Sequence, residues 1–330
     1  MPTRNLLMLD FDGTITAHDT LAALVSLCIA HQPAKATKTS PPEPDRSRLL
    51  SALWDEIVRD YVADHEAHVA AYTPRAEERT TLAQELTYLE SLRAVEDKSV
   101  ARVGMAGFFR GMDAARMRAL GGVACVRGKG IVAKDGEDGD EGEVGGGVDD
   151  GGDGVDGKGK GGAVRLRKGF LPFIAEMTSH EEWDVAVVSV NWSGEFIRGV
   201  LEAGSQYGRR VKKVVANGIG LPDGLVKGPE ELGGEPLVTA GDKLRAMRSL
   251  KVGMGEQSVV YFGDSTTDLA CLVEADLGVV MADDGGSKLL RTFERVGLEV
   301  LHVGVAEEGS RLVWARDFEE VLESKVMERI

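Results

Sequence analysis

Two carboxylates at the tip of one apolar run are the first feature of this chain that could do chemistry. In "LLMLDFDGT", residues 6–14, Asp10 and Asp12 follow four apolar residues typical of a strand buried on both faces. Gly13 and Thr14 mark the end of that strand, because glycine permits the sharp turn with which a chain leaves a sheet. Open α/β sheets bind ligands at the carboxyl ends of their parallel strands. The pair of acids therefore predicts a functional crevice at this strand end.

Polar residues at further element ends should face the same crevice. Ser189 follows "VAVV", Asp264 follows "VVYFG", Asp268 lies four residues later, and Lys243 opens a predicted helix. Carboxylates 4 Å apart repel one another by roughly 4 kcal/mol per pair at an effective dielectric near 20. One lysine cannot offset this repulsion, whereas Mg²⁺, which prefers oxygen ligands, can. The predicted metal ligands are Asp10, Asp12, Asp264 and Asp268.

Such a site is suited to phosphoryl transfer. A free aspartate has a pKa near 3.9 and is ionised at neutral pH, so it needs no base to become a nucleophile. Asp10 would attack phosphorus and form an aspartyl phosphate, while Asp12 would protonate the leaving oxygen and then activate water. Mg²⁺ and Lys243 would neutralise the phosphate, and Ser189 would hold its oxygens. These roles predict a phosphomonoesterase.

Four motifs in chain order resemble those of the haloacid dehalogenase (HAD) superfamily: "DFDGT", a serine after an apolar strand (Ser189), a lysine opening a helix (Lys243), and "GDSTTD". The resemblance covers 1–16 and about 165–330. It implies that Asp10 is the nucleophile and that Asp12 is the acid/base. It also implies a Mg²⁺ ion held by Asp10, the Asp12 carbonyl and Asp264, with Asp268 as a ligand or a partner of one. An acid at position 12 points to the phosphatase branch.

An insert directly after the first motif resembles the C1 cap of phosphoserine-phosphatase-like members, which closes over the crevice and favours small phosphorylated metabolites. Two details depart from the family: many relatives have Gly-Gly after the second-motif serine, where this chain has Val190 and Asn191, and many have glycine in place of Ser265. The resemblance marks further candidates for substrate or phosphate contact: Gly13, Thr14, Asp19, Asn191 and Trp192. Arg167 and Lys168 are candidate substrate or gating residues.

Residues 17–133 predict an all-helical domain. A helix is expected at 21–29, a second along the stripe that contains Trp54 and Tyr61, a third opened by Pro74, and shorter ones at 97–110 and 112–120. We interpret Trp54 and Tyr61 as packing residues. The tract 134–162 holds ten acids, three lysines and many glycines, which predicts a disordered linker. The acidic residues of this tract are not followed by the glycine and the terminal glutamate that an EF-hand requires, which argues against a calcium-binding loop.

Strands and helices alternate from about 165 to 330, which predicts a doubly wound, Rossmann-like parallel sheet of the α/β class, with the first strand (6–10) in the same sheet. Later strands are expected at 184–190, 211–217, 258–264, 277–281 and 298–303. Helices are expected at 193–204, 240–251, 266–275, 287–293 and 316–327. The helical domain is thus predicted as an insertion between the first two strands.

Composition excludes several classes of protein. The formal net charge of −15 argues against a nucleic-acid partner or an anionic membrane surface. The three cysteines show no metal-ligand or redox spacing, which favours reduced thiols. The apolar runs are too short for a secretory signal or a membrane span, so we expect a cytoplasmic location. The oligomeric state and the identity of the substrate stay open.

Other functions can be compared with the phosphomonoesterase on the same residues. A phosphoryl-transfer relative such as a mutase would share the site and differ only in what accepts the phosphoryl group. A catalytically silent HAD-like binding or scaffold protein would have no need of all four acids. A glycosyltransferase with a D-x-D motif does not account for "GDSTTD" or Lys243, and a serine hydrolase lacks the G-x-S-x-G context.

Overall fold

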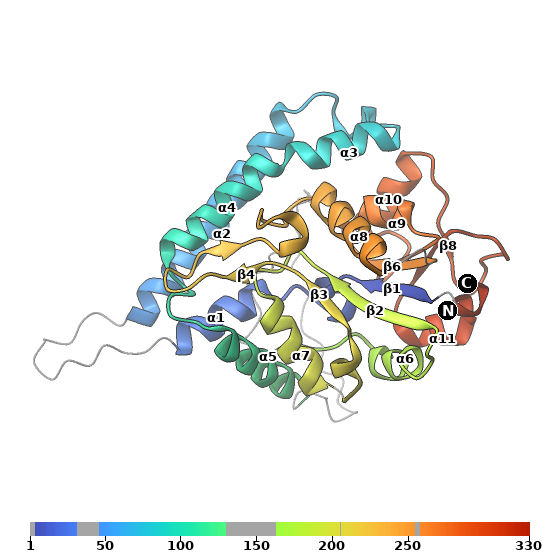
Figure 1. Ribbon diagram of the computed structural model, residues 1–330. Helices are drawn as coiled ribbons and strands as arrows, with labels where there is room; N and C mark the ends of the chain where they lie inside the picture. The colour runs from blue at the N-terminus through green and yellow to red at the C-terminus, as the bar shows by residue number, and fades with distance from the viewer. Residues whose placement is uncertain (1–3, 32–45, 130–162, 205, 255–257) are drawn as a thin grey trace, which may run out of the picture.

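The computed structural model describes residues 4–31, 46–129, 163–204, 206–254 and 258–330 (Figure 1). The linker predicted at 134–162 lies outside the described residues. Among the described residues, no helix combines the length and the apolar character that crossing a bilayer requires.

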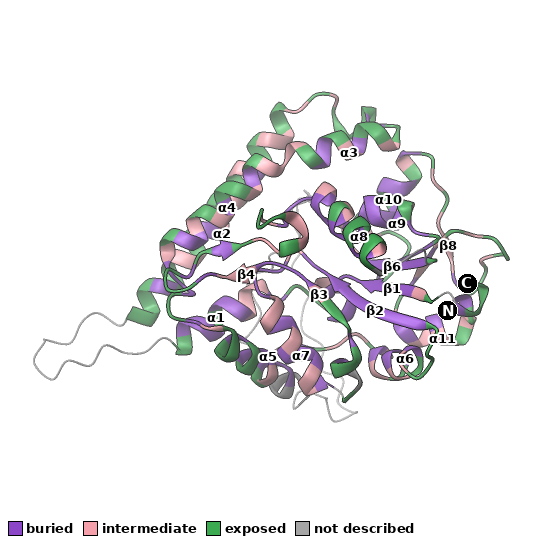
Figure 2. Cartoon of the chain, viewed as in Figure 1, coloured by how far each residue is buried: buried purple, intermediate pink, exposed green. Residues whose placement is uncertain are grey.

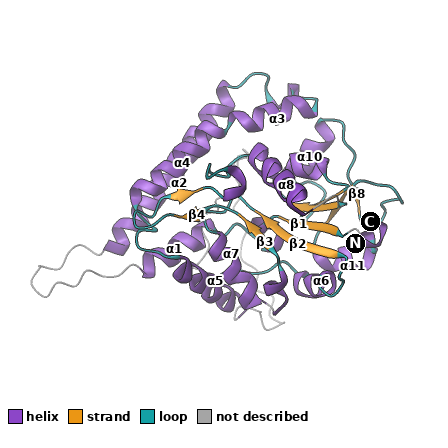
Figure 3. Ribbon diagram, viewed as in Figure 1, coloured by secondary structure: helices purple, strands orange, loops and turns teal. Residues whose placement is uncertain are grey.

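A seven-stranded sheet forms the centre of the molecule, in the order β3-β2-β1-β6-β7-β9-β8 (Figure 3). Every paired neighbour in it is parallel, as the α/β prediction required. The strands are β1 (Asn5–Leu9), β2 (Trp183–Val188), β3 (Lys213–Val215), β6 (Val259–Gly263), β7 (Leu277–Met281), β8 (Leu301–His302) and β9 (Leu312–Ala315). A separate antiparallel pair comprises β4 (Gly218–Ile219) and β5 (Val226–Lys227).

Successive residues of each central strand pack into two different cores, one on each face of the sheet. In β1, Leu7 and Leu9 join one core while Leu6 and Met8 join the other. Period-two alternation of side chains explains why the run is apolar throughout, since both faces are covered (Figure 2). Asp10 comes next after Leu9, where the strand leaves the sheet.

Helices cover both faces of the sheet. The first core draws on α6 (Phe170–Met177), α7 (Gly194–Gly204) and α11 (Phe318–Ser324), and the second on α8 (Ala240–Met254), α9 (Leu269–Glu274) and α10 (Lys288–Arg295). The remaining helices precede residue 130: α1 (Leu21–His31), α2 (Arg46–Ala71), α3 (Leu82–Ser91), α4 (Arg93–Ala106) and α5 (Ala114–Lys129). These five helices come from the region predicted to be all-helical.

Helix α5 packs directly against α7 of the α/β unit (Figure 1). A Cβ atom at Gly121 would lie 2.1 Å from the Phe196 carbonyl oxygen, and one at Gly199 would lie 1.9 Å from the Arg118 carbonyl oxygen. Only glycine permits two helix backbones to approach this closely. The helical region is therefore joined tightly to the sheet unit at one end.

Two groups of ion pairs join the other end of the helical region to the sheet unit. Glu85 on α3 accepts from Arg79 at 2.7 Å and lies 2.9 Å from Arg295 on α10. Arg93 on α4 lies 2.6 Å from Asp242, the residue before Lys243 on α8. Glu85 and Asp242 are almost completely buried, so both pairs are protected from solvent screening.

Two local predictions are wrong. Pro74 does not open a helix and lies in the turn after α2. Helix α3 begins only at Leu82, where Thr81 as N-cap and Gln84 form a capping box. The strand predicted at 298–303 is reduced to β8, and β9, which joins β7 to β8, was missed. The physical reason is the same in both places: local hydrogen bonding and sheet pairing decide where elements start, and apolar patterning alone does not.

Candidate active site

The turn after β1 sets the geometry of the candidate site. The amide of Asp10 donates to the Phe262 carbonyl of β6 at 2.9 Å, so the ends of β1 and β6 lie together. Gly13 then has a φ of +74°, a conformation that disfavours any residue with a side chain. A Cβ atom at position 13 would also lie 2.1 Å from Asp264 Oδ2. Glycine at this position is thus required for Asp264 to approach the turn.

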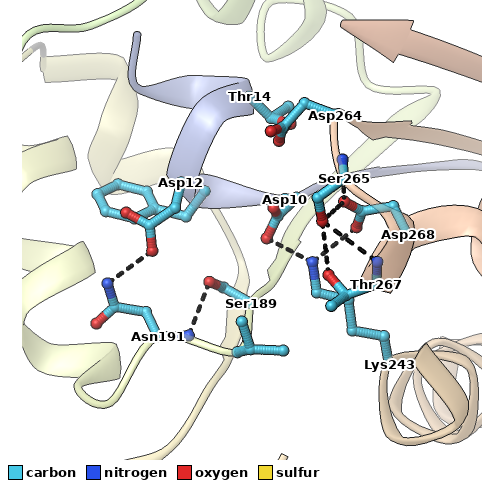
Figure 4. Close-up of polar contacts among 12 residues, drawn as sticks. Asp10, Asp12, Thr14, Ser189, Asn191, Lys243, Asp264, Ser265, Thr267 and Asp268 are labelled. Carbon is cyan, nitrogen blue, oxygen red and sulfur yellow. Dashed lines mark hydrogen bonds and ion pairs between the residues drawn. The ribbon is translucent and has the colours of Figure 1, made fainter. Parts of the chain in front are cut away.

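Lys243 lies between two buried carboxylates (Figure 4). Its Nζ atom is 3.0 Å from Asp10 Oδ1 and 2.7 Å from Asp268 Oδ1, and the side chain is fully buried. Tyr261 donates its hydroxyl to the same Asp268 oxygen at 2.7 Å. Burial lowers the pKa of Lys243, but Asp10 and Asp268 more than offset this, so its pKa lies above the ordinary value. The lysine is therefore a permanent cation beside Asp10.

Asp10, Asp264 and Asp268 form one carboxylate cluster, in which each offers an oxygen within 4.8 Å of the others. Thr14 donates to Asp264 Oδ1 at 2.7 Å. Desolvation, followed by repulsion from Asp268, raises the pKa of Asp264 to about 8, and the same two causes raise the pKa of Asp10 well above its ordinary value. When all three carboxyl groups are ionised, the cluster carries more negative charge than Lys243 neutralises.

The cluster fits a divalent cation. Asp10 Oδ1 is buried and faces Lys243 Nζ at 3.0 Å. Lys243 is shared between Asp10 and Asp268, so the three carboxylates, when ionised, keep an excess of buried negative charge that a divalent cation would balance. Three carboxylates with no nitrogen or sulfur ligand among them are the donor set of a hard ion such as Mg²⁺.

Asp12 has a separate set of partners on the opposite side of the turn. Asp12 Oδ1 accepts from the Thr20 hydroxyl at 2.5 Å and from the Thr20 amide at 2.9 Å. Asp12 Oδ2 accepts from Asn191 Nδ2 at 2.8 Å (Figure 4). Desolvation raises the pKa of Asp12, while these hydrogen bonds partly oppose the shift. A carboxyl group with a raised pKa is suited to exchange a proton.

Ser189 and Asn191 lie together beyond the end of β2, and both are buried. Ser189 Oγ accepts from the Asn191 amide at 3.1 Å, so its hydroxyl hydrogen stays available to another acceptor. Thr14, Ser189 and Asn191 thus lie around the two aspartates, with Thr14 beside Asp264 and Asn191 beside Asp12 (Figure 4). The predicted metal role of the Asp12 carbonyl stays a prediction.

The comparisons with known proteins give one curated relative at low identity. The chain is 22% identical over 323 residues to the bifunctional TH2 protein, mitochondrial, of Arabidopsis thaliana. The match covers 92% of this chain but 45% of the relative, so the chain spans less than half of that protein. No family model matches the chain.

Solved structures resemble the chain along nearly all of its length. A protein of unknown function from Anaerococcus prevotii has a TM-score of 0.49 at 14% identity, over 95% of this chain and 85% of its own. A phosphoserine phosphatase in its apo form has a TM-score of 0.44 at 13% identity, over 97% of this chain and 98% of its own. The sequence identities and TM-scores of these structures are low, so the proposed function depends on the side chains of the site.

Three further residues predicted to contact or gate the substrate, Arg167, Lys168 and Asp19, have protein partners of their own. Arg167 donates to the Gly13 carbonyl and pairs with Asp283 at 3.0 Å, so it supports the turn. Lys168 is 68% exposed and pairs with Glu319 at 2.7 Å, away from the carboxylate cluster. Asp19 accepts from the Leu21 amide at the start of α1.

Three residues around the site were not singled out by the sequence analysis. Thr20 holds Asp12, Tyr261 holds Asp268, and Asp242 caps the first turn of α8, where it accepts from the amides of Val238 and Thr239. A tyrosine inside a buried strand indicates a polar group nearby, because its buried hydroxyl requires a hydrogen-bond partner. Asp242 also has a signal, because "TAGD" at 239–242 has the spacing of a capping box, whereas the contact between Thr20 and Asp12 leaves none.

Proposed function

We propose that this chain is a Mg²⁺-dependent phosphatase of the HAD superfamily that hydrolyses a small phosphorylated metabolite through an aspartyl phosphate on Asp10. The observation that carries the proposal is the position of Asp10: its buried Oδ1 lies 3.0 Å from Lys243 Nζ and belongs to a carboxylate cluster that fits a cation. Asp12, a second acid with separate partners, stands beside it.

The proposed reaction has two steps. An Asp10 oxygen attacks phosphorus and the bond to the leaving oxygen breaks, while Asp12 donates its proton to that oxygen. A water molecule then gives a proton to Asp12 and attacks phosphorus, which breaks the bond to Asp10 and releases inorganic phosphate. The Ser189 hydroxyl and Lys243 bind phosphoryl oxygens in both steps.

Mg²⁺ would be held by Asp10, Asp264 and Asp268, and when bound it neutralises charge on the phosphoryl oxygens. Helices α1–α4 would act as the cap predicted within residues 17–133. Tyr61 and Glu96 from that region line the same cavity as Thr266 and Thr267, which follow Asp264 in the chain, and this supports a cavity shared by the helical region and the sheet unit beside the site. Exclusion of bulk water by a cap would strengthen the electrostatic interactions between the site and the phosphoryl group.

The Asp12→Asn variant tests the roles of the second aspartate. With an alkyl phosphate we expect kcat to fall by about 10²- to 10⁴-fold, because the leaving alkoxide then departs without a proton. With 4-nitrophenyl phosphate the first step needs little protonation, so we expect a burst of one equivalent of nitrophenolate followed by slow turnover. Rapid-quench measurement of nitrophenolate and phosphate release checks this. Equal losses with both esters and no burst would contradict the assignment of Asp12.

Mg²⁺ affinity should depend on pH. The pKa of Asp264 is about 8 without metal, so below that pH its carboxyl group is protonated and must lose a proton before it can bind a cation. We expect the Mg²⁺ dissociation constant, measured by calorimetry, to rise by up to about tenfold for each pH unit below 8. In Asp264→Asn, affinity should be weaker and this slope flatter. An affinity that is constant between pH 6 and 8 would argue against a metal on Asp264.

A further inference from the structure

A second, smaller cavity lies beside the chain segments that hold Asp12 and has no role in the proposed reaction. Its volume is about 130 Å³, and it is lined by both the helical region and the sheet unit. A cavity of about 150 Å³ is large enough to hold benzene, so this one accommodates about one six-membered ring.

The leaving group of the substrate must lie near Asp12, and the cavity lies beside the chain segments that hold this residue. Asp12, the proposed acid, is held by Thr20 and Asn191. Thr20 is flanked in the chain by Asp19 and Leu21, and both of these line the cavity. Asn191 is likewise flanked by two lining residues, Val190 and Trp192. Both residues that hold Asp12 are therefore flanked in the chain by residues of the cavity wall, although neither they nor Asp12 line the cavity themselves.

Aromatic and apolar side chains make most of the wall. Trp54 and Tyr61 of α2 face Trp192 of the sheet unit, and the Trp54 and Trp192 rings meet edge to face with centroids 6.1 Å apart. Trp54 and Tyr61, which helical periodicity predicts to be packing residues, also line this cavity. Faces of tryptophan and tyrosine attract cations, the more so when water is excluded.

The charged residues of the wall have one sign. Glu96 of α4 and Asp19 line the cavity, and no lysine, arginine or histidine is among its described lining residues. Glu96 is half-buried and accepts from the Tyr61 hydroxyl at 2.8 Å, which fixes a carboxylate beside an aromatic ring. Glu96 and Tyr61 also line the neighbouring cavity of about 980 Å³, whose wall differs in that it includes Arg79, Lys288 and Arg295.

We propose that the 130 Å³ cavity binds the leaving group of the substrate, and that this group is positively charged and about the size of one ring. The inference rests on the proposed phosphatase function and narrows its substrate class. Glu96 is then a specificity-determining residue, and Trp54, Tyr61 and Trp192 supply the aromatic surface against which the cation lies.

Two esters of the same shape test the charge. In (1-methylpyridinium-3-yl)methyl phosphate the ring is cationic, and in 3-methylbenzyl phosphate it is neutral. We expect kcat/KM of the wild-type protein to favour the cationic ester at least about tenfold. In Glu96→Gln, which keeps an oxygen for the Tyr61 hydroxyl, this preference should fall about tenfold. Asp97→Asn, an exposed neighbour on α4, removes the same charge and should keep the preference.

Binding of the two corresponding alcohols to the Asp10→Asn protein, measured by calorimetry, separates this inference from the phosphatase proposal. Tighter binding of the cationic alcohol that is lost on adding Glu96→Gln supports the pocket, even where neither ester is hydrolysed. Equal binding of both alcohols, or a preference that Glu96→Gln leaves intact, overturns the pocket while ester hydrolysis still stands. Absence of phosphate release from every ester counts against the phosphatase proposal alone.

Discussion

Asp10→Asn is expected to reduce phosphate release by at least ~10⁴-fold while the protein stays folded. The amide has no charge with which to attack phosphorus, and the neighbouring carboxylates have partners of their own: Asp12 accepts from Thr20 and Asn191, Asp264 from Thr14, and Asp268 from Lys243 and Tyr261. Stability should be kept or increased. Burial, then repulsion from Asp268, raises the pKa of Asp10, so the native state holds this carboxylate at a cost that asparagine removes.

The measurement is phosphate release from small phosphomonoesters with Mg²⁺ and with EDTA, together with a thermal melt. Asp223→Asn is the matched control, since Asp223 is exposed in the β4–β5 loop and loses the same charge. Mass spectrometry of acid-quenched samples should find a phosphoryl group on the wild-type protein and none on Asp10→Asn. Wild-type turnover in the variant would mean that Asp10 is not the nucleophile.

The fold class could be predicted from the sequence because the strands are buried on both faces. Continuous apolar runs such as 6–9 and 259–262 have no other stable location in a protein of this size. β9 was missed because its four residues, "LVWA", follow a loop and carry no alternation that distinguishes them from a helix start. Its place in the sheet comes from pairing with β7 and β8, which is information that a single strand does not contain.

The sequence indicates the candidate site residues that directly follow strands. It does not indicate the contacts between residues far apart in the chain. Asp10 and Asp264 follow β1 and β6, which are neighbours in the sheet, so their approach follows from topology. Arg93 reaches Asp242 across 149 positions of sequence, and nothing near either residue predicts the other. The aromatic wall of the small cavity is similar: helical periodicity identifies Trp54 as inward-facing, but not which space it faces.

Lys243→Met should be the most destabilising single substitution in the site. It leaves the carboxylates of Asp10 and Asp268 buried without their common cation, and loss of one partner from a buried ion pair costs about 3–5 kcal/mol. We expect chemical denaturation of the metal-free variant to show a loss of this size, and Mg²⁺ to raise its melting temperature more than that of the wild type, because the ion supplies the missing positive charge.

Two comparisons make the Lys243 prediction decisive. Lys213→Met removes a lysine whose side chain is 47% exposed and which pairs with Glu231 at 2.7 Å; an exposed pair of this kind contributes about 0–1 kcal/mol. Similar losses in the two variants would show that burial of the carboxylates does not govern the effect. The double variant Lys243→Met/Asp268→Asn removes one buried carboxylate with the lysine, so it should recover part of the lost stability. A double variant less stable than Lys243→Met would mean that Lys243 acts by packing, and its charge would then have no part in holding Asp10 ready for attack.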